Sequence, residues 1–90
     1  MILHYYQDPG HGWVKIKRET LRKLGILAKV SHFSYQRGDF VYLEEDCDVS
    51  LLYKTMDAKG QVLALRTSHT DKQSKIRSYA SFGLRPGECV

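Results

Sequence analysis

The chain has 90 residues and a formal net charge of +4, with 42% hydrophobic and 27% charged residues. This length supports one hydrophobic core and excludes a second domain, and the composition excludes a wholly disordered chain. No apolar run approaches the roughly 18 residues of a membrane span, and the N-terminus lacks the basic and apolar regions of a signal peptide. We therefore expect a cytoplasmic protein with no membrane partner.

Two strands joined by a tight turn are predicted at the start of the chain. Side chains are β-branched or aromatic over Ile2 to Gln7, and apolar and polar side chains alternate over Trp13 to Lys17. Between them, residues 8–12 hold a proline, which presets φ for a turn, and two glycines, which adopt positive φ without steric cost. The pattern predicts a β-hairpin.

A short helix is predicted over residues 18–24. Leu21 and Leu24 lie three residues apart, and Gly25 stands where a helix C-terminus favours a left-handed residue. We expect the apolar segment 26–30 to pack against the sheet. The exposed side of this helix is expected to present Arg18, Arg22 and Lys23.

A second hairpin is predicted from His32 to Gln36 and from Phe40 to Glu44, with a glycine in the turn between them. The best-marked helix follows, because Asp46 or Asp48 can cap its start and Gly60 stops it after Lys59. Its apolar stripe has the spacing of a buried helix face and consists of Val49, Leu52, Tyr53 and Met56.

The remaining elements complete one α+β domain over residues 1–82. Val62 to Arg66 is predicted to be a strand, 67–74 a polar loop, and the residues after Ser74 a last short helix. The expected architecture is a small antiparallel sheet of about five short strands with two or three helices packed on one face. Residues 83–90 are predicted to form an irregular C-terminal tail.

No catalytic or metal-binding motif occurs in the sequence. The four histidines, at positions 4, 11, 32 and 69, lack the spacing of a zinc site. Cys47 and Cys89 form no C-x-x-C pair and have no recognisable catalytic partner, so both are expected to be reduced thiols. We predict no enzyme activity, no metal and no cofactor.

The acidic run at residues 44–48 has three interpretations. Carboxylates at a helix start cap free N–H groups and offset the helix dipole. A calcium loop is disfavoured, because Leu51 and Asp57 occupy the positions that need glycine and glutamate. The third interpretation is an acidic surface that docks on a protein and consists of Glu44, Glu45, Asp46 and Asp48.

Residues 67–77 collect hydroxyls, an imidazole and three cations just before a predicted helix. Groups of this kind bind phosphate, although an ordinary flexible surface loop has the same composition. The candidate residues for phosphate or nucleic-acid binding are His69, Thr70, Lys72, Ser74, Lys75 and Arg77.

A second basic group runs from Lys15 to Lys29, beside aromatic residues. Cations bind backbone phosphates and exposed aromatic rings stack on unpaired bases, but a structural role explains the aromatic residues equally well, and no known RNA-binding motif is present. Whether the two basic groups share a face is left open. The candidate residues here are Trp13, Lys15, Lys17 and Arg22.

Several strings of this sequence resemble a group of small uncharacterised proteins encoded by bacteriophages and prophages. They are Tyr6-Gln7-Asp8-Pro9-Gly10-His11-Gly12-Trp13-Val14, Leu24-Gly25-Ile26, Ser34-Tyr35 and Val41-Tyr42-Leu43-Glu44-Glu45-Asp46-Cys47-Asp48. The resemblance carries over no activity, cofactor or catalytic residue. It implies a small accessory protein that binds host machinery stoichiometrically, with counter-defence as one such role.

Three functions follow, in decreasing order of expectation. The first is binding to a host protein in the cytoplasm of the host cell. The second is binding to nucleic acid or a nucleotide through residues 67–77 and the Lys15 to Lys29 group. The third is a small hydrolase or transferase with His11 or His69 as its base, which is disfavoured because no partner for either histidine can be placed. A homo-oligomer would supplement so small a core.

Overall fold

A six-stranded sheet with the strand order β5-β1-β2-β4-β3-β6 organises the molecule. The computed structural model describes residues 1–88. Its strands are β1 (Ile2–Gln7), β2 (Gly12–Lys17), β3 (Tyr35–Arg37), β4 (Phe40–Glu44), β5 (Ala64–His69) and β6 (Ala80–Ser81). Its helices are α1 (Arg18–Lys23), α2 (Val49–Ala58) and two 3₁₀ helices, η1 (Leu27–Lys29) and η2 (Lys75–Ser78). The predicted α+β class is confirmed.

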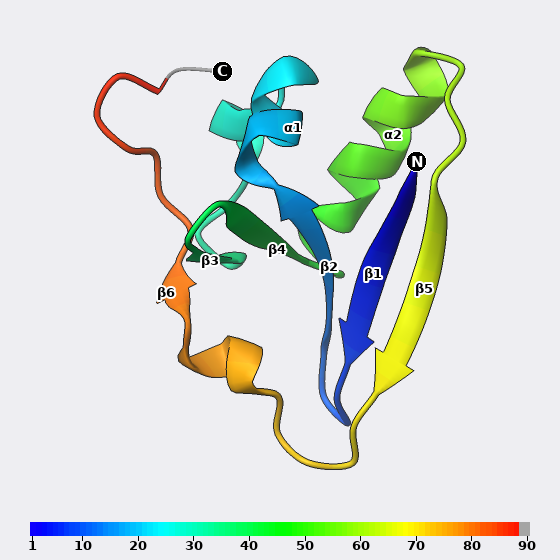
Figure 1. Cartoon of the computed structure of the whole chain (residues 1–90), viewed down its shortest axis with the longest axis vertical. Helices are drawn as coiled ribbons and strands as arrows, with labels where there is room; N and C mark the ends of the chain where they lie inside the picture. Colours follow the sequence, from blue (N-terminus) through cyan, green and yellow to red (C-terminus); the bar gives the residue numbers. More distant parts are fainter. Residues whose placement is uncertain (89–90) are drawn as a thin grey trace.

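The sheet is mixed, whereas the sequence predicted an antiparallel one. β1, β2, β4 and β3 pair antiparallel, but β5 pairs parallel with β1. The physical reason is the connection from β4 to β5, which passes through α2 (Figure 1). A helical crossover of this kind returns the chain in the same direction and so joins parallel strands.

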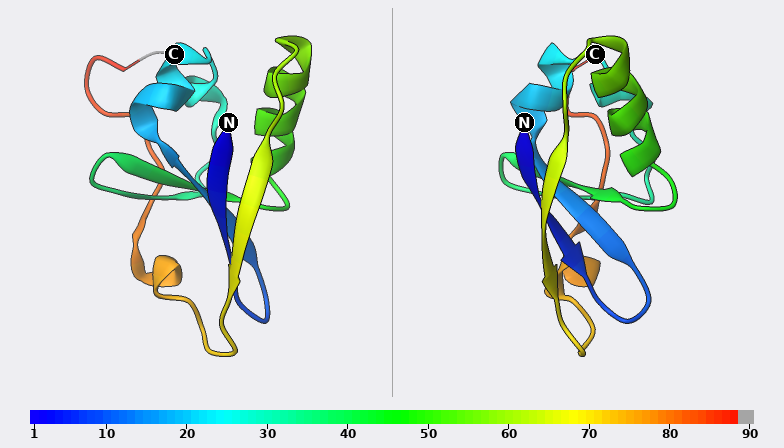
Figure 2. Two further views of the ribbon diagram at one scale, coloured as in Figure 1. Left: turned by 45° about the vertical axis from the view of Figure 1, so that its right-hand side comes forward. Right: turned by 90° about the vertical axis from the view of Figure 1, so that its right-hand side faces the viewer.

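The two faces of the sheet bury different residues. On one face, α1, η1 and α2 cover an aliphatic core that includes Val14 and Ile16 of β2, Leu21 of α1 and Leu52 of α2 (Figure 2). The other face carries a second, largely aromatic cluster around Trp13, Tyr42 and Ile76. Alternation along each strand sends neighbouring residues to opposite faces. The predicted separation of Val14 and Ile16 from Lys15 and Lys17 is confirmed.

Two strands differ from their predicted bounds, and a third strand was not predicted. The strand expected at 32–36 is β3, because residues 31–34 form a turn in which the Ser31 and Ser34 hydroxyls donate to Asp48. The strand expected at 62–66 is β5, which begins at Ala64 and extends to His69, since β1 offers a parallel edge along its whole length. The short strand β6 was not anticipated.

The hairpin turn is built as expected, but its glycines act differently. Gly10 and Gly12 are not among the glycines with positive φ, which are Gly25, Gly38, Gly60 and Gly87. Gly12 is needed for space, because a Cβ there would lie 1.9 Å from the Tyr5 hydroxyl oxygen. Gly25, Gly38 and Gly60 have the left-handed backbone that their predicted turn or helix ends require.

Arg18, predicted to be exposed on α1, is buried. Its guanidinium donates to both carboxylate oxygens of Glu88, at 2.6 and 2.7 Å, and to the carbonyl oxygen of Gly83 at 2.7 Å. Hydrogen bonds from Arg18 and from the Arg85 backbone lower the pKa of Glu88 to about 2. The segment that follows β6 is thus tied to the start of α1 by charge-assisted hydrogen bonds.

None of the helices within residues 1–88 has the length and apolar character needed to cross a membrane.

Candidate functional site

The face of the sheet opposite α1 and α2 is only partly covered, and we call it the open face. η2 and the residues around it cover the part over Trp13 and Tyr42. The rest is formed by residues of β1, β2 and β4 that alternate with the core positions. The side chains on this part of the open face include His4 and Tyr6 of β1 and Lys15 and Lys17 of β2.

Two adjacent hollows mark the open face. The first, of about 420 Å³, lies over β1 and β2 and is lined by side chains that include His4, Lys17 and Phe40. The second, of about 180 Å³, lies beside η2 and is lined by Tyr42, Ser74, Lys75, Ile76 and Tyr79 among others. Tyr6 and Lys15 line both hollows. Among residues 1–88, neither hollow is lined by an aspartate or a glutamate.

Cations and aromatic rings are interleaved on this face. The Lys15 Nζ atom lies 4.2 Å from the centroid of the Phe40 ring. The His4 and Tyr6 rings stack with their centroids 4.3 Å apart, and His4 Nε2 lies 2.6 Å from the Ser68 hydroxyl of β5. Cation–π contacts and stacking hold these side chains in place, so the face presents fixed positive charge beside partly exposed aromatic rings.

The two predicted basic groups meet in part on the open face. Lys15 and Lys17 come from β2, and Ser74 and Lys75 come from the segment before and within η2. Lys15 and Lys75 line the same hollow, although they are 60 positions apart in the printed sequence. The open question of whether the groups share a face is answered for these residues.

Other predicted members of the basic groups lie elsewhere. Trp13 is 1% exposed, so it packs within the aromatic cluster and cannot stack on a base. Arg22 is on α1, where both of its guanidinium contacts go to Glu19. His69 is the last residue of β5, and Thr70 and Lys72 follow it as exposed residues.

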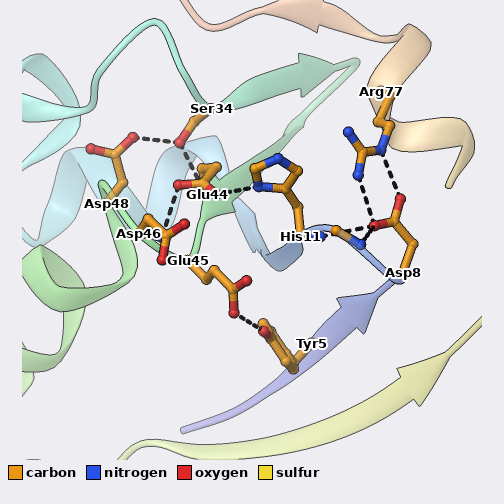
Figure 3. A network of polar contacts seen from close by, with 10 residues as sticks. Tyr5, Asp8, His11, Ser34, Glu44, Glu45, Asp46, Asp48 and Arg77 are labelled. Atoms are coloured by element: carbon orange, nitrogen blue, oxygen red, sulfur yellow. Dashed lines mark hydrogen bonds and ion pairs between the residues drawn. The ribbon is translucent and has the colours of Figure 1, made fainter. Parts of the chain in front are cut away.

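Arg77 is committed to Asp8 in an ion pair whose carboxylate is buried and whose guanidinium is partly exposed (Figure 3). Asp8 accepts hydrogen bonds from Arg77 Nε at 2.7 Å and from Arg77 Nη2 at 2.9 Å. It also accepts from the backbone N–H groups of Gly10, His11 and Ser74 at 2.9 to 3.0 Å. The Arg77 guanidinium and these N–H groups hold the pKa of Asp8 far below its usual range. This contact, the Asp8 clamp, fixes the η2 segment against the β1–β2 turn.

His11, Glu44 and Asp46 form the one group within residues 1–88 whose ligand atoms could meet on a metal ion, since these atoms lie within 4.8 Å of one another. The Glu44 carboxylate already has partners, because His11 Nδ1 lies 3.1 Å from Oε1 and the Asp46 N–H donates to Oε2 at 2.8 Å (Figure 3). A metal ion would have to displace the His11 contact, so the group is satisfied as a hydrogen-bonded cluster.

The predicted acidic docking surface is smaller than the sequence implied. Glu44 and Asp48 are buried, and Asp48 accepts hydrogen bonds from Ser31 and Ser34. Glu45 is half-buried and accepts a hydrogen bond from the Tyr5 hydroxyl. Burial raises the pKa of Tyr5, and so do the hydrogen bond to Glu45 and the negative charge of that carboxylate. Among the four predicted residues, Asp46 alone is exposed.

Cys47 is an exposed free thiol, and Cys89 lies outside the described residues. Desolvation and a hydrogen bond to Glu44 raise the pKa of the Cys47 thiol. A raised pKa lowers the thiolate fraction at neutral pH, and the thiolate is the reactive form. Cys47 is therefore poorly suited to act as a nucleophile.

No protein-family model matches the sequence, and no curated protein or solved structure is similar to it. The resemblance to phage proteins is not tested by these comparisons, and binding to a host protein stays a prediction.

Sequence reasoning missed the aromatic side of the open face. Phe40, Tyr42 and Tyr79 were not candidate site residues, yet they line the hollows beside Lys15. The signal was present in the predicted strand Phe40 to Glu44, where Val41 and Leu43 alternate with two aromatic residues. A strand with apolar residues on both faces indicates that other parts of the protein pack against both faces.

Proposed function

We propose that the protein binds single-stranded nucleic acid on the open face of its sheet. The supporting observation is the pair of adjoining hollows that share Tyr6 and Lys15, contain Lys17 and Lys75, and have no carboxylate of residues 1–88 in their lining. Lysines attract backbone phosphates, and accessible aromatic rings supply stacking surfaces for unpaired bases.

The shape of the site favours a single strand over a duplex. Base stacking on a sheet requires bases that are splayed out, which a duplex does not offer. The hollows lie over β1, β2 and β4. The one described helix on this face, η2, has four residues and packs on the sheet, so it is too short to act as a major-groove reader. Because stacking tolerates every base, we expect little sequence preference.

Replacing Lys15 and Lys75 together by glutamine is expected to weaken binding to a labelled oligothymidylate by about tenfold. Each lost lysine removes about one phosphate contact, so the slope of log K against log salt should become shallower by about 1.4. Fluorescence anisotropy titrations at several salt concentrations measure both quantities.

The matched control replaces Lys23 and Lys54 by glutamine. These lysines are exposed on α1 and α2, on the other side of the sheet, and their loss changes the net charge equally. The control should bind like the wild type. Equal weakening of both double variants would assign the effect to net charge and would contradict a site on the open face.

A further inference from the structure

The sheet ends in two very different edges. β6 has two residues, whereas β5 has six, of which all but Leu65 are exposed. A free strand edge presents unpaired N–H and C=O groups to other strands, and proteins usually block it with short strands, prolines, lysines or bulges. β5 has no proline, no lysine and an unbroken register with β1, and its single charged residue is Arg66. Figure 2 (right) shows β5 in front of the sheet, with no helix or strand of residues 1–88 over it.

The pairing of β5 with β1 determines which backbone N–H and C=O groups of β5 point away from the sheet. The Ala64 N–H donates to the Met1 carbonyl oxygen at 2.9 Å, and the Thr70 N–H donates to the Gln7 carbonyl oxygen at 2.9 Å. Since backbone groups alternate in direction along a strand, the even-numbered residues of β5 face β1. Leu65, Thr67 and His69 therefore turn their N–H and C=O groups away from the sheet.

We propose that the free edge of β5 pairs antiparallel with β5 of a second copy of this chain, about a twofold axis at Thr67. In this register Thr67 lies opposite Thr67 of the partner subunit, and Leu65 lies opposite His69 of the partner subunit. The three resulting pairs are the outward-facing residues, so each pair exchanges two hydrogen bonds. The register uses every outward group of the strand.

The side chains fit this self-pairing. Arg66 lies opposite Ser68 of the partner subunit, which keeps the two arginines from facing each other directly. Facing threonines are a favourable cross-strand pair. The twofold axis runs perpendicular to the sheet, so the two open faces lie on the same side. The association itself does not depend on the proposed nucleic-acid binding.

The test is sedimentation equilibrium of the full chain with two separate substitutions at Thr67. Thr67→Lys places two like charges opposite each other at the axis, and Thr67→Pro removes an outward N–H without touching a bond to β1. Proline removes one hydrogen bond from each copy, and each variant should weaken dimerisation by at least about tenfold. Ser50→Lys, at an exposed position of α2, adds the same charge and should leave the dimer unchanged.

Amide hydrogen exchange provides a readout that does not require either variant to fold. The N–H groups of Leu65, Thr67 and His69 should become protected as the wild-type concentration rises through the dimerisation range. A wild type that stays monomeric at every concentration would overturn the proposal. A dimer that neither Thr67 variant weakens would also overturn it. So would protection of these N–H groups in a complex of one copy of this chain with a different polypeptide.

Discussion

Replacing Gly12 by alanine is expected to destabilise the fold by about 3 kcal/mol, the upper end of the cost of overpacking a well-packed site. The added Cβ would lie 1.9 Å from the Tyr5 hydroxyl oxygen and 2.4 Å from Tyr5 Cζ. The ring cannot move freely, because the Tyr5 hydroxyl donates to Glu45 and the Glu45 N–H donates to the Gly12 carbonyl oxygen at 3.0 Å. Urea unfolding followed by the fluorescence of Trp13 measures the loss.

A double-mutant cycle with Tyr5→Leu isolates the clash. Leucine removes the hydroxyl and the outer ring atoms, so the second substitution, Gly12→Ala, should cost much less in that background. We expect a coupling energy of about 2 kcal/mol between the two positions. Additive effects would mean that Gly12 is required for some reason other than the space that Tyr5 occupies.

Replacing Asp8 by asparagine is expected to cost about 3 kcal/mol of unfolding free energy at neutral pH, as for other broken buried ion pairs. Asparagine keeps the shape of the side chain but removes its charge and turns an NH₂ group toward donors. All five groups that are hydrogen-bonded to the Asp8 carboxylate are donors, supplied by Arg77 and by the backbone of Gly10, His11 and Ser74. Asp57→Asn, at an exposed position of α2, is the matched control and should cost less than about 0.5 kcal/mol.

The cost of Asp8→Asn should depend on pH in a definite direction. The pKa of Asp8 is lowered in the folded state, so its contribution is complete above the unfolded value of about 4 and is lost as the pH falls below it. The wild type and the variant should therefore converge in stability between about pH 4 and pH 2. The lowered pKa of Glu88, about 2, makes both proteins lose stability in the same range. A difference that stays constant with pH would show that charge is not the reason for the clamp.

The local parts of the fold could be predicted from the sequence. The turn after β1 is closed by the Asp8 N–H, which donates to the His11 carbonyl oxygen at 2.9 Å, within the predicted segment. The end of α2 falls where Gly60 adopts a φ of 68°. These features depend on residues that are close in sequence, so the chain encodes them in short patterns.

The remainder depends on partners that are distant in the chain. Arg18 was expected on the surface because its partner Glu88 is 70 positions away. Asp8 was read as a turn residue because Arg77 is 69 positions away. Residues 67–69 were predicted to be part of a loop, because their polar side chains do not show the alternation of a strand. They are in a strand because they pair with β1, which is distant in the sequence.

The candidate site was predicted as two separate basic groups. Lys15 and Lys17 could be placed opposite Val14 and Ile16 by alternation alone. That Lys75 joins them required the Asp8 clamp, which brings η2 onto the open face. The same clamp pairs Arg77 with Asp8. The sequence therefore predicted a binding role for Arg77 that its ion pair with Asp8 disfavours, and it could not show that Lys75 lies beside Lys15.

The account rests most directly on the affinity of the wild type for single-stranded nucleic acid as a function of salt. We would titrate the protein into a labelled oligothymidylate of about 15 nucleotides between about 50 and 200 mM salt. With Lys15, Lys17 and Lys75 each contacting a phosphate, log K should fall against log salt with a slope of about −2, and a duplex of the same length should bind more weakly. No measurable binding at the lowest salt, or binding that does not change with salt, would contradict the proposed function.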